Sequence, residues 1–339
     1  MINNKKITKV PKLNIMFTNK QLQEKVNAYI SNIVYNAQPE KLYSPIQYVL
    51  SLGGKRIRPT LMLMAYNLYK EDVDSIMPCA IGLETYHNFT LLHDDLMDCA
   101  DMRRGMPTVH KKWDDNTAIL SGDAMLIFAY KLMCKHKSES MYKALDTFTE
   151  ATLGVCEGQQ YDMDFECRTD VTENEYMEMI RLKTSLLLAC ALKIGAQLAN
   201  AKEEDVENLY TFGEKMGLAF QLQDDLLDVY GNPEIFGKKI GGDILCNKKT
   251  FMLINALNMA EGKTKEELRS WILQKNYNPE EKIAAVTAIY NTVGIKSICE
   301  AKIKQLFTEA IENLDKVEVE ECKKRELRDF ANNLMGREL

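Results

Sequence analysis

The sequence predicts an all-α protein, a single large helical bundle around a central cavity. Helix-forming residues dominate, and only 8 of the 339 residues are proline. Segments that alternate between apolar and polar residues, as strands do, are nearly absent. With 46% hydrophobic residues, the chain can bury a sizeable core. No Pro/Ser-rich linker or block of like charges divides the sequence. We therefore expect a loose N-terminal leader over residues 1–16 and one domain over residues 17–339.

Glycine and proline mark the boundaries of the expected helices. Gly53-Gly54 interrupts the chain, and Pro59 suits the first residue of a new helix. Gly105 and Pro107 break a loop at residues 101–107, and a Gly/Lys-rich loop spans residues 234–247. The expected helices cover residues 18–36, 42–51, 59–70, 74–100, 114–136, 139–165, 172–199, 203–230, 248–260, 264–275, 280–293, 295–315 and 318–334.

Composition and charge exclude several classes of protein. The net charge of −6 argues against a nucleic-acid partner. The nine cysteines include no C-x-x-C pair, which indicates a reducing compartment and no zinc site. The N-terminal lysines precede no apolar stretch of the kind found in secretory signals. The longest apolar stretch, residues 185–199, contains Lys193 and is too short to span a bilayer. We expect a cytoplasmic protein without a membrane span.

Two aspartate motifs of the same design are the most informative feature of the sequence. They occupy residues 94–98 (DDLMD) and 224–228 (DDLLD). On a helix, residues four apart share one face, so Asp94 lies beside Asp98 and Asp224 beside Asp228. Like charges at this spacing destabilise a bare helix. Carboxylates with coordination positions to spare suit Mg²⁺ that is shared with substrate phosphates. The two motifs therefore predict an enzyme that handles a diphosphate.

Four basic elements accompany the aspartates. They are residues 53–59 (GGKRIRP), Arg103-Arg104, Lys183-Thr184, and the lysines Lys238, Lys239 and Lys248. A helix N-terminus favours anions, and arginine forks match diphosphate oxygens. Taken singly, each motif also fits a solvated helix end, a surface loop or a snorkelling lysine. Their occurrence together favours a site for two diphosphates.

These segments resemble the trans-isoprenyl diphosphate synthases of the polyprenyl synthetase family, from about Lys41 to Thr250. The matching residues are 53–59 (GGKRIRP), 91–98 (LLHDDLMD), 101–105 (DMRRG), 183–184 (KT), 220–228 (FQLQDDLLD), 237–238 (GK), 242–243 (GD) and 248–250 (KKT). No catalytic element of the family is missing. The resemblance implies the all-α isoprenoid synthase fold and a prenyltransferase. Such an enzyme condenses isopentenyl diphosphate head to tail (1′-4) with an allylic diphosphate.

The resemblance also implies a role for each candidate residue. Asp94, Asp98 and Asp224 would hold Mg²⁺, three ions per active site. Asp95, Asp225 and Asp228 would either bind the metal ions or lie directly behind the residues that do. Arg103, Lys183, Lys238 and Lys248 would neutralise the allylic diphosphate, and Thr184 and Gln221 would face the allylic cation. Lys55, Arg58, His87 and Arg104 would hold isopentenyl diphosphate. His93 is expected to pack rather than to ligate. Family analogy suggests a homodimer.

The product length is expected to depend on side chains that precede Asp94 on its helix. Thr90 lies one turn before Asp94, Tyr86 two turns before it, and Phe89 alongside. We call these three residues the chain-length floor. Thr90 is small, whereas Phe89 and Tyr86 should stop a long tail, unless both are plain core residues. An aromatic residue five positions before the first motif resembles short-chain enzymes. We expect a C20 product, geranylgeranyl diphosphate, with C15 farnesyl diphosphate as the next choice.

Four alternatives compete with this interpretation. A medium- or long-chain synthase would tend to carry a small residue in place of Phe89. A terpene cyclase would share the first motif and the helical fold, but it has no use for residues 53–59 and would not repeat the D-D-x-x-D. A non-catalytic subunit that modulates a partner typically lacks one acidic motif. A scaffold protein needs no paired metal clusters.

Overall fold

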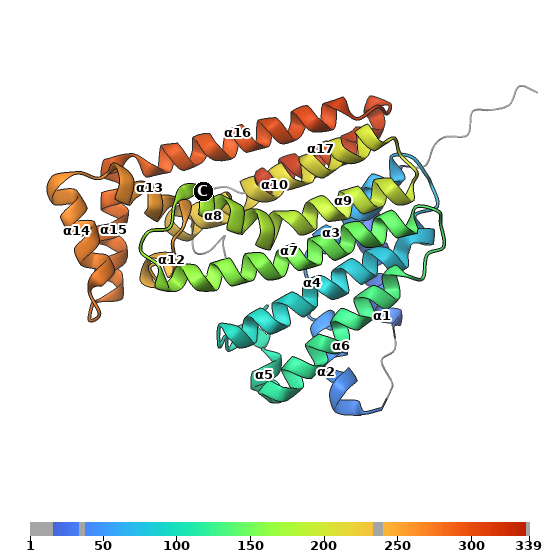
Figure 1. Ribbon diagram of the computed structural model, residues 1–339, viewed down its shortest axis with the longest axis horizontal. Coiled ribbons are helices and arrows are strands. Elements are labelled where there is room, and N and C mark those ends of the chain that lie inside the picture. The colour runs from blue at the N-terminus through green and yellow to red at the C-terminus, as the bar shows by residue number, and fades with distance from the viewer. Residues whose placement is uncertain (1–15, 34–37, 233–239, 337–339) are drawn as a thin grey trace, which may run out of the picture.

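The chain folds as a bundle of α-helices, as the sequence predicts. The computed structural model describes residues 16–33, 38–232 and 240–336. The leader expected over residues 1–16 therefore lies almost entirely outside the described residues. Figure 1 shows the long helices α4, α6, α7, α9, α10 and α16 lying roughly alongside one another, with α14 and α15 at one end. Within the described residues, no helix is both long and apolar enough to cross a bilayer.

The first half of the chain forms the helices that carry the first aspartate motif. They are α1 (Asn19–Asn32), α2 (Glu40–Ser51), α3 (Ile57–Asn67), the 3₁₀ turn η1 (Val73–Ile76), α4 (Met77–Met97), α5 (Val109–Lys112), α6 (Asp115–Met133) and α7 (Met141–Cys167). Residues 74–100, expected as one helix, divide into η1 and α4. Pro78 stands in the first turn of α4, where its missing N–H costs no helical hydrogen bond.

The second half carries the second motif. Its elements are α8 (Glu173–Ile180), the π-helical turn η2 (Arg181–Ser185), α9 (Leu186–Leu198), α10 (Glu203–Tyr230), α12 (Gly242–Leu245), α13 (Phe251–Met259), α14 (Gly262–Leu273), α15 (Pro279–Val293), α16 (Ile295–Lys316) and α17 (Glu321–Met335). The helix expected over residues 172–199 is therefore interrupted by a π turn. The helix expected from residue 248 begins at Phe251, because the side chain of Thr250 caps its N-terminus.

The loop after α4 contains a small hairpin that sequence periodicity could not predict. Strands β1 (Met102–Arg103) and β2 (Met106–Pro107) pair antiparallel. The two residues between them, Arg104 and Gly105, have φ values of 53° and 75°. Positive φ at both positions is what a type I′ hairpin turn requires, and Gly105 supplies one of them without strain.

Two hydrophobic clusters fill the bundle. One lies among α1–α4, α6, α7, α9, the first half of α10, the C-terminal part of α16, and α17. The other lies among α8, the second half of α10, and α13, α15 and α16. Helix α10 packs against α16 and α9, and α4 packs against α6. The second aspartate motif therefore lies at the end of a helix that is anchored in both clusters.

Candidate active site

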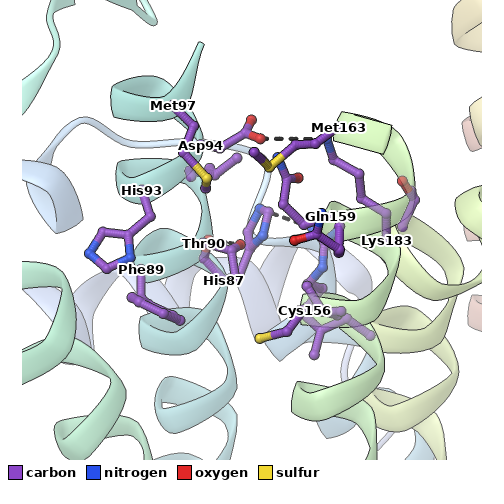
Figure 2. A pocket seen from close by; sticks show the side chains of 16 residues that line it. His87, Phe89, Thr90, His93, Asp94, Met97, Cys156, Gln159, Met163 and Lys183 are labelled. Carbon is purple, nitrogen blue, oxygen red and sulfur yellow. Dashed lines mark hydrogen bonds and ion pairs between the residues drawn. The ribbon is translucent and has the colours of Figure 1, made fainter. Parts of the chain in front are cut away.

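A cavity of about 360 Å³ opens between α4 and α7. Figure 2 shows Asp94 at its upper end, with Met97 and Met163 nearby, and Phe89 and Cys156 lower down on opposite helices. The lining residues are Arg58, His87, Phe89, Thr90, Leu91, His93, Asp94, Met97, Val155, Cys156, Gln159, Gln160, Met163, Lys183, Thr184 and Leu187. The cavity is polar at the end near Asp94 and mostly apolar below it, as a diphosphate with a hydrocarbon tail would require.

The first aspartate motif is held by the hairpin that follows it. Arg103 donates from Nε to both carboxylate oxygens of Asp95, at 2.8 and 2.7 Å, and its Nη2 lies 2.7 Å from Oδ1 of Asp95. The same Nη2 is 3.9 Å from Asp94. Such charge-assisted, forked bonds fix geometry as well as charge. Asp95 is buried behind Arg103, so the carboxylate that lines the cavity is that of Asp94.

Adjacent hairpin residues point to different sites. Arg103 reaches Asp95, whereas Arg104 donates from Nη1 to the carbonyl of Gly53. The guanidinium of Arg104 lies so close to Gly54 that a Cβ there would stand 2.8 Å from its Nη2. Glycine at position 54 is therefore needed for this contact, in addition to its φ of 129°. The hairpin links the first aspartate motif to the basic loop at residues 53–59.

Lys183 bridges two carboxylates across the cavity. Its Nζ lies 2.6 Å from Oδ2 of Asp162 on α7 and 3.5 Å from Oδ1 of Asp94. The π turn η2 presents this lysine to the cavity, and such turns often occur at functional sites. Glycines on both sides make room for the turn. A Cβ at Gly158 would clash with the backbone nitrogen of Lys183, and one at Gly217 would clash with the Cα of Ser185.

Asp162 is a site residue that the sequence reasoning missed. It lies on α7, outside both D-D-x-x-D motifs, so motif spacing gave no signal for it. The available hint in the sequence was a carboxylate shortly after Gly158-Gln159 on an expected helix. Asp162 also acts on Asp98: burial raises the pKa of Asp98, and the negative charges of Asp94, Asp162 and Glu166 raise it further, while Lys183 lowers it.

The second aspartate motif has different partners. Asp225 accepts a hydrogen bond from the Tyr176 hydroxyl at Oδ2 and one from Nε2 of Gln221 at Oδ1, the latter at 3.0 Å. Burial, followed by the charge of Asp243, raises the pKa of Asp225 to about 7, although Lys248, Tyr176 and Gln221 lower it. Gln221 was predicted to share a face with Asp224, but its amide bonds to Asp225, since residues four apart on a helix are neighbours as well.

Asp228 holds backbone rather than lining the cavity. Its Oδ2 accepts from the Asp243 N–H at 3.0 Å, and its carbonyl accepts from the Gly241 N–H at 2.6 Å. Gly241 has a φ of 84°, which suits glycine at this turn. The third carboxylate of the second motif therefore fixes the start of α12, after which Lys248 follows.

Lys248 joins the two aspartate motifs electrostatically. Burial lowers its pKa, but nearby carboxylates outweigh burial and leave the pKa raised above the ordinary value. These carboxylates are Asp243, Asp225, Asp162 and Asp94, so they belong to α12, to both motifs and to α7. The structure thus brings together α4, α7, η2, α10 and the segment after α12. A lysine held charged among four carboxylates suits a site that also binds a polyanion and cations.

A second cavity of about 480 Å³ lies beside the first and is predominantly basic. It is lined by Leu52, Gly54, Lys55, Arg56, Ile57, Arg58, Glu84, His87 and Arg104. Arg58 and His87 line both cavities and therefore stand between them. The buried Nε of Arg58 has no hydrogen-bond partner among the described residues, which fits an anionic ligand.

His87 is an acceptor in this basic surrounding. Burial lowers its pKa well below the ordinary value, and Arg58, Arg104, Arg103 and Arg56 lower it further. The neutral ring lies 3.0 Å from Nη1 of Arg58, which can donate only, so Nε2 accepts. Burial likewise lowers the pKa of Arg58 to about 10, still charged at neutral pH. His87 therefore orients Arg58 and leaves the positive charge to the arginines.

Arg56, between the two predicted ligands Lys55 and Arg58, supports the loop instead. It is buried in an ion pair with Glu84 at 2.7 Å and donates to the Leu50 carbonyl at 2.7 Å. It also donates from Nε to Asn27. A buried pair with its remaining donors satisfied fixes a conformation more than it adds stability. Arg56 thus anchors the loop that presents its neighbours to the second cavity.

Two residues of the chain-length floor line the first cavity, and the third lies behind them. Phe89 and Thr90 line the first cavity, whereas Tyr86 does not and is 1% exposed. The ring of Tyr86 lies 5.5 Å from that of Phe89, and its hydroxyl donates to the Thr152 carbonyl. Phe148 and Tyr130 continue the aromatic stack behind it. His93 packs edge-on against Phe89, which agrees with its expected packing role, although its ring also lines the cavity.

The donor set fits Mg²⁺ that is bound together with a substrate diphosphate. In the described part of the chain, no three His, Cys, Asp or Glu side chains gather into a complete metal cage. Mg²⁺ rarely uses such cages; it keeps several waters and binds one or two carboxylates plus phosphates. Asp94 and Asp98 form such an open pair, and their mutual repulsion, seen in the raised pKa of Asp98, is what a cation would relieve.

The structure places most of the predicted site residues around the two cavities. Asp94, Asp95, Asp98, Arg103, Lys183, Thr184, Gln221, Asp225 and Lys248 surround the first cavity or contact the residues that do. Lys55, Arg58, His87 and Arg104 line the second. Lys238 and Lys239 lie outside the described residues, so the structure does not place them.

The chain is similar to known prenyl diphosphate synthases over most of its length. The polyprenyl synthetase family model matches residues 39–291. A geranylgeranyl diphosphate synthase of Methanosarcina mazei is 42% identical over 68% of this chain and 72% of its own length. A geranylfarnesyl diphosphate synthase of Natronomonas pharaonis is 40% identical over 69% of this chain and 74% of its own.

Solved structures give the same result for the fold. A crystal structure of a geranylgeranyl pyrophosphate synthase superposes with a TM-score of 0.91 at 42% identity, covering 96% of this chain and all of its own. The all-α fold expected from the sequence is therefore confirmed, as is the family resemblance. This chain belongs to the polyprenyl synthetase family, a family of prenyltransferases.

Proposed function

We propose that this protein condenses isopentenyl diphosphate with allylic diphosphates to give a short-chain trans-prenyl diphosphate. The observation that carries the proposal is the meeting of both aspartate motifs around two lysines, at the polar end of an apolar cavity. Lys183 pairs with Asp94 and Asp162. Carboxylates of both motifs raise the pKa of Lys248 and so keep it charged. A basic cavity adjoins this site, so two diphosphates can bind side by side.

The first diphosphate, that of the allylic substrate, binds at the aspartates. Lys183 and Lys248 face its oxygens, and Arg103 fixes Asp95 so that Asp94 is presented to the cavity. Mg²⁺, which we propose at three ions per site on Asp94, Asp98 and Asp224, supplies Lewis-acid charge for the leaving diphosphate. Lys238 completes this set by family analogy. Positive charge aimed at the departing oxygen lowers the barrier to ionisation, because that is where negative charge develops.

The second diphosphate, that of isopentenyl diphosphate, binds at Lys55, Arg58 and Arg104. His87 accepts a hydrogen bond from Arg58 and keeps it oriented. The double bond of isopentenyl diphosphate then attacks the allylic cation beside Arg58 and His87, which line both cavities. Thr184, which lines the cavity and donates its hydroxyl hydrogen to Gln221, faces that cation with its oxygen, and the released pyrophosphate takes the proton. No side-chain nucleophile is needed.

The product is proposed to be C20, geranylgeranyl diphosphate, with C15 as the alternative. Phe89 projects into the cavity, and Tyr86 and Phe148 stand behind it. This aromatic stack supports a tail that stops at short length. The relatives include both geranylgeranyl and geranylfarnesyl diphosphate synthases, so C25 is the nearest longer outcome.

A product assay tests the proposal. The purified protein would be incubated with Mg²⁺, labelled isopentenyl diphosphate and, separately, dimethylallyl, geranyl and farnesyl diphosphates. The dephosphorylated products would be sized by chromatography. We expect incorporation that ends at C20, and a rate at least about 100-fold lower in Asp94→Asn. Folded protein that incorporates no isopentenyl diphosphate from any starter would refute the proposal and favour a cyclase or a modulating subunit.

We further propose that the protein forms a homodimer through α6. This helix exposes Ile119, Leu120 and Ile127 at 45%, 61% and 68%. Leu120 and Ile127, seven residues apart, share one face of the helix. Contiguous exposed apolar residues on a soluble protein mark an interface, and two-fold self-association is the commonest one. The partner is a second copy, as family analogy suggests.

The dimer is tested by measuring mass in solution. Ile127→Asp is expected to convert the dimer to monomers, because it places charge in the centre of the buried face. Leu273→Asp, on the exposed face of α14, serves as the matched control, since Leu273 is 75% exposed and far along the chain from α6. A monomeric wild type, or a dimer unaffected by Ile127→Asp, would contradict this interface.

We propose a cytoplasmic location. None of the nine cysteines, all within the described residues, forms a disulfide. Cys79, Cys190 and Cys299 are buried thiols, as expected in a reducing compartment. Fractionation of cells with an antibody to this chain would test the location, and recovery with the membrane or secreted fraction would contradict it.

A further inference from the structure

A chain of hydrogen bonds runs from the core beneath the second aspartate motif to the cavity. It begins at Tyr176 on α8, which is 1% exposed, and passes to Asp225 on α10, which is 3% exposed. It continues to Gln221, one turn earlier on α10, and ends at Thr184 in the π turn. Thr184 is the member that lines the cavity, directly after Lys183.

The polarity of this chain is fixed at its buried end. The Tyr176 hydroxyl donates to Oδ2 of Asp225, and the amide nitrogen of Gln221, which can only donate, donates to Oδ1. The amide of Gln221 must therefore turn its nitrogen toward Asp225. Its oxygen is left on the opposite side, where it accepts from the Thr184 hydroxyl at 3.1 Å.

As a result, the Thr184 hydroxyl presents only its negative partial charge to the cavity. Once the Thr184 hydrogen is donated to Gln221, the hydroxyl oxygen can meet the cavity only with its lone pairs. An amide with the opposite orientation would instead give its hydrogens to Thr184, and Thr184 would turn its own hydrogen outward. Developing positive charge in the cavity is stabilised by the first arrangement and opposed by the second.

We propose that Tyr176 and Asp225 are positioning residues that set the orientation of Gln221 and Thr184 toward the reacting carbon. Asp225 acts through Gln221 and not as a metal ligand, because it is 3% exposed, does not line the cavity and directs its two oxygens toward Tyr176 and Gln221. This assigns a role to Tyr176, which neither aspartate motif nor any basic element of the sequence indicated. The inference rests on the proposed binding of the allylic diphosphate at this site.

A reciprocal swap of acid and amide tests the proposal. Asp225→Asn and Gln221→Glu are each expected to lower kcat about tenfold or more, since each breaks a buried hydrogen bond to a charged group. The double variant restores the polarity. Its carboxylate, now at position 221, accepts from Thr184 and from the amide now at position 225, and the oxygen of that amide accepts from Tyr176. We expect the double variant to recover at least part of the loss, far above the product of the two single effects.

Three further measurements distinguish a positioning role from metal binding and from a purely structural role. Tyr176→Phe should lower kcat with little change in KM or in the Mg²⁺ concentration for half-maximal rate. It should also raise the share of allylic diphosphate that is hydrolysed to alcohol instead of condensed. Tyr66→Phe is the matched control, a buried tyrosine that donates to Asp72 away from both cavities; it should lower Tm and leave kcat unchanged.

The outcomes are distinguishable. An inactive wild type would refute the proposed function, whereas an active wild type allows the variants to decide the inference. Wild-type kcat and alcohol yield in Tyr176→Phe would overturn it. So would a double variant with no recovery, or variants whose rate returns at high Mg²⁺, because that behaviour identifies Asp225 as a metal ligand. If Tyr176→Phe does not fold, the exchange of acid and amide at positions 221 and 225 still tests the proposal.

Discussion

The two D-D-x-x-D motifs match in sequence spacing but differ in surroundings. In the first, the middle carboxylate, Asp95, is held by the partly exposed hairpin arginine Arg103. In the second, the middle carboxylate, Asp225, is held by Tyr176 and Gln221 from within the core. The third carboxylates differ as well. Asp98 repels its neighbours near the cavity, whereas Asp228 binds the backbone at the start of α12.

This contrast shows that a motif states which residues are present but not what each carboxylate does. The first motif presents charge, since the residue that anchors it, Arg103, is a cation that also lies 3.9 Å from Asp94. The second is built to hold shape, since two of its three carboxylates have neutral or backbone donors as partners. Replacements at matching positions should therefore have different effects.

The largest effect is expected at the first aspartate of each motif. Asp94→Asn and Asp224→Asn should each lower kcat by about 10²–10³-fold, because each removes charge that stabilises the leaving diphosphate through the metal. Steady-state assays over a range of Mg²⁺ concentrations would measure the loss. Asp329→Asn, on the exposed face of α17, is the matched control. If either motif tolerated the change, the two clusters would not act on one diphosphate.

Removal of the hairpin anchor should have the next largest effect. Arg103→Gln is expected to lower kcat/KM about 10- to 100-fold, since a bond between charged groups is lost and Asp95 is left buried without its cation. Arg103→Lys should recover only part, because lysine lacks the fork. Competition with an allylic diphosphate would report binding. Full recovery by lysine would show that charge alone, not the fork, matters.

A smaller effect is expected at Asp162, which lies on α7 outside both aspartate motifs and pairs with Lys183. Asp162→Asn should lower kcat/KM for the allylic substrate about tenfold, because Lys183 loses its 2.6 Å partner and its position. The KM for isopentenyl diphosphate should stay unchanged, since the second cavity is separate. Asp164→Asn, two residues further on α7 and exposed, is the control. An equal loss for both substrates would mean a general structural defect.

The smallest effect on rate, but a change of product, is expected at Phe89. Phe89→Ala should lengthen the main product by at least one isoprene unit, because it opens the lower wall of the cavity. Tyr86 and Phe148 should still limit the tail, so very long products are not expected. Chromatography of dephosphorylated products would measure this. An unchanged product would return Phe89 to the role of a core residue.

Much of the fold and the site could be predicted from the sequence because both depend on local patterns. Apolar periodicity and the glycine and proline breaks gave nearly every long helix to within a few residues at each end. The aspartate and basic motifs indicated candidate ligands, because few other chemistries need those residue types together, and their roles remain predictions. Lys238 remains a prediction, as do the single domain and the homodimer.

Contacts between distant segments could not be predicted. Asp162 joins the site because α7 packs beside the π turn, which is made possible by Gly158 and Gly217 on two different helices. The partnership of Tyr176 with Asp225, 49 residues apart, depends on how α8 meets α10. The hairpin at residues 102–107 is too short for a periodic signal.

The sequence by itself determined the helices, the family and the inventory of charged groups, because helix formation and metal chemistry depend on residue type and short spacing. Tertiary structure decided which carboxylates face the cavity and which hold the protein together. The reason is that a carboxylate's role depends on its donors, and those donors come from helices far apart in the chain. Two motifs with the same spacing therefore differ in their contacts. The first presents charge to the cavity, whereas two carboxylates of the second hold neighbouring side chains and backbone.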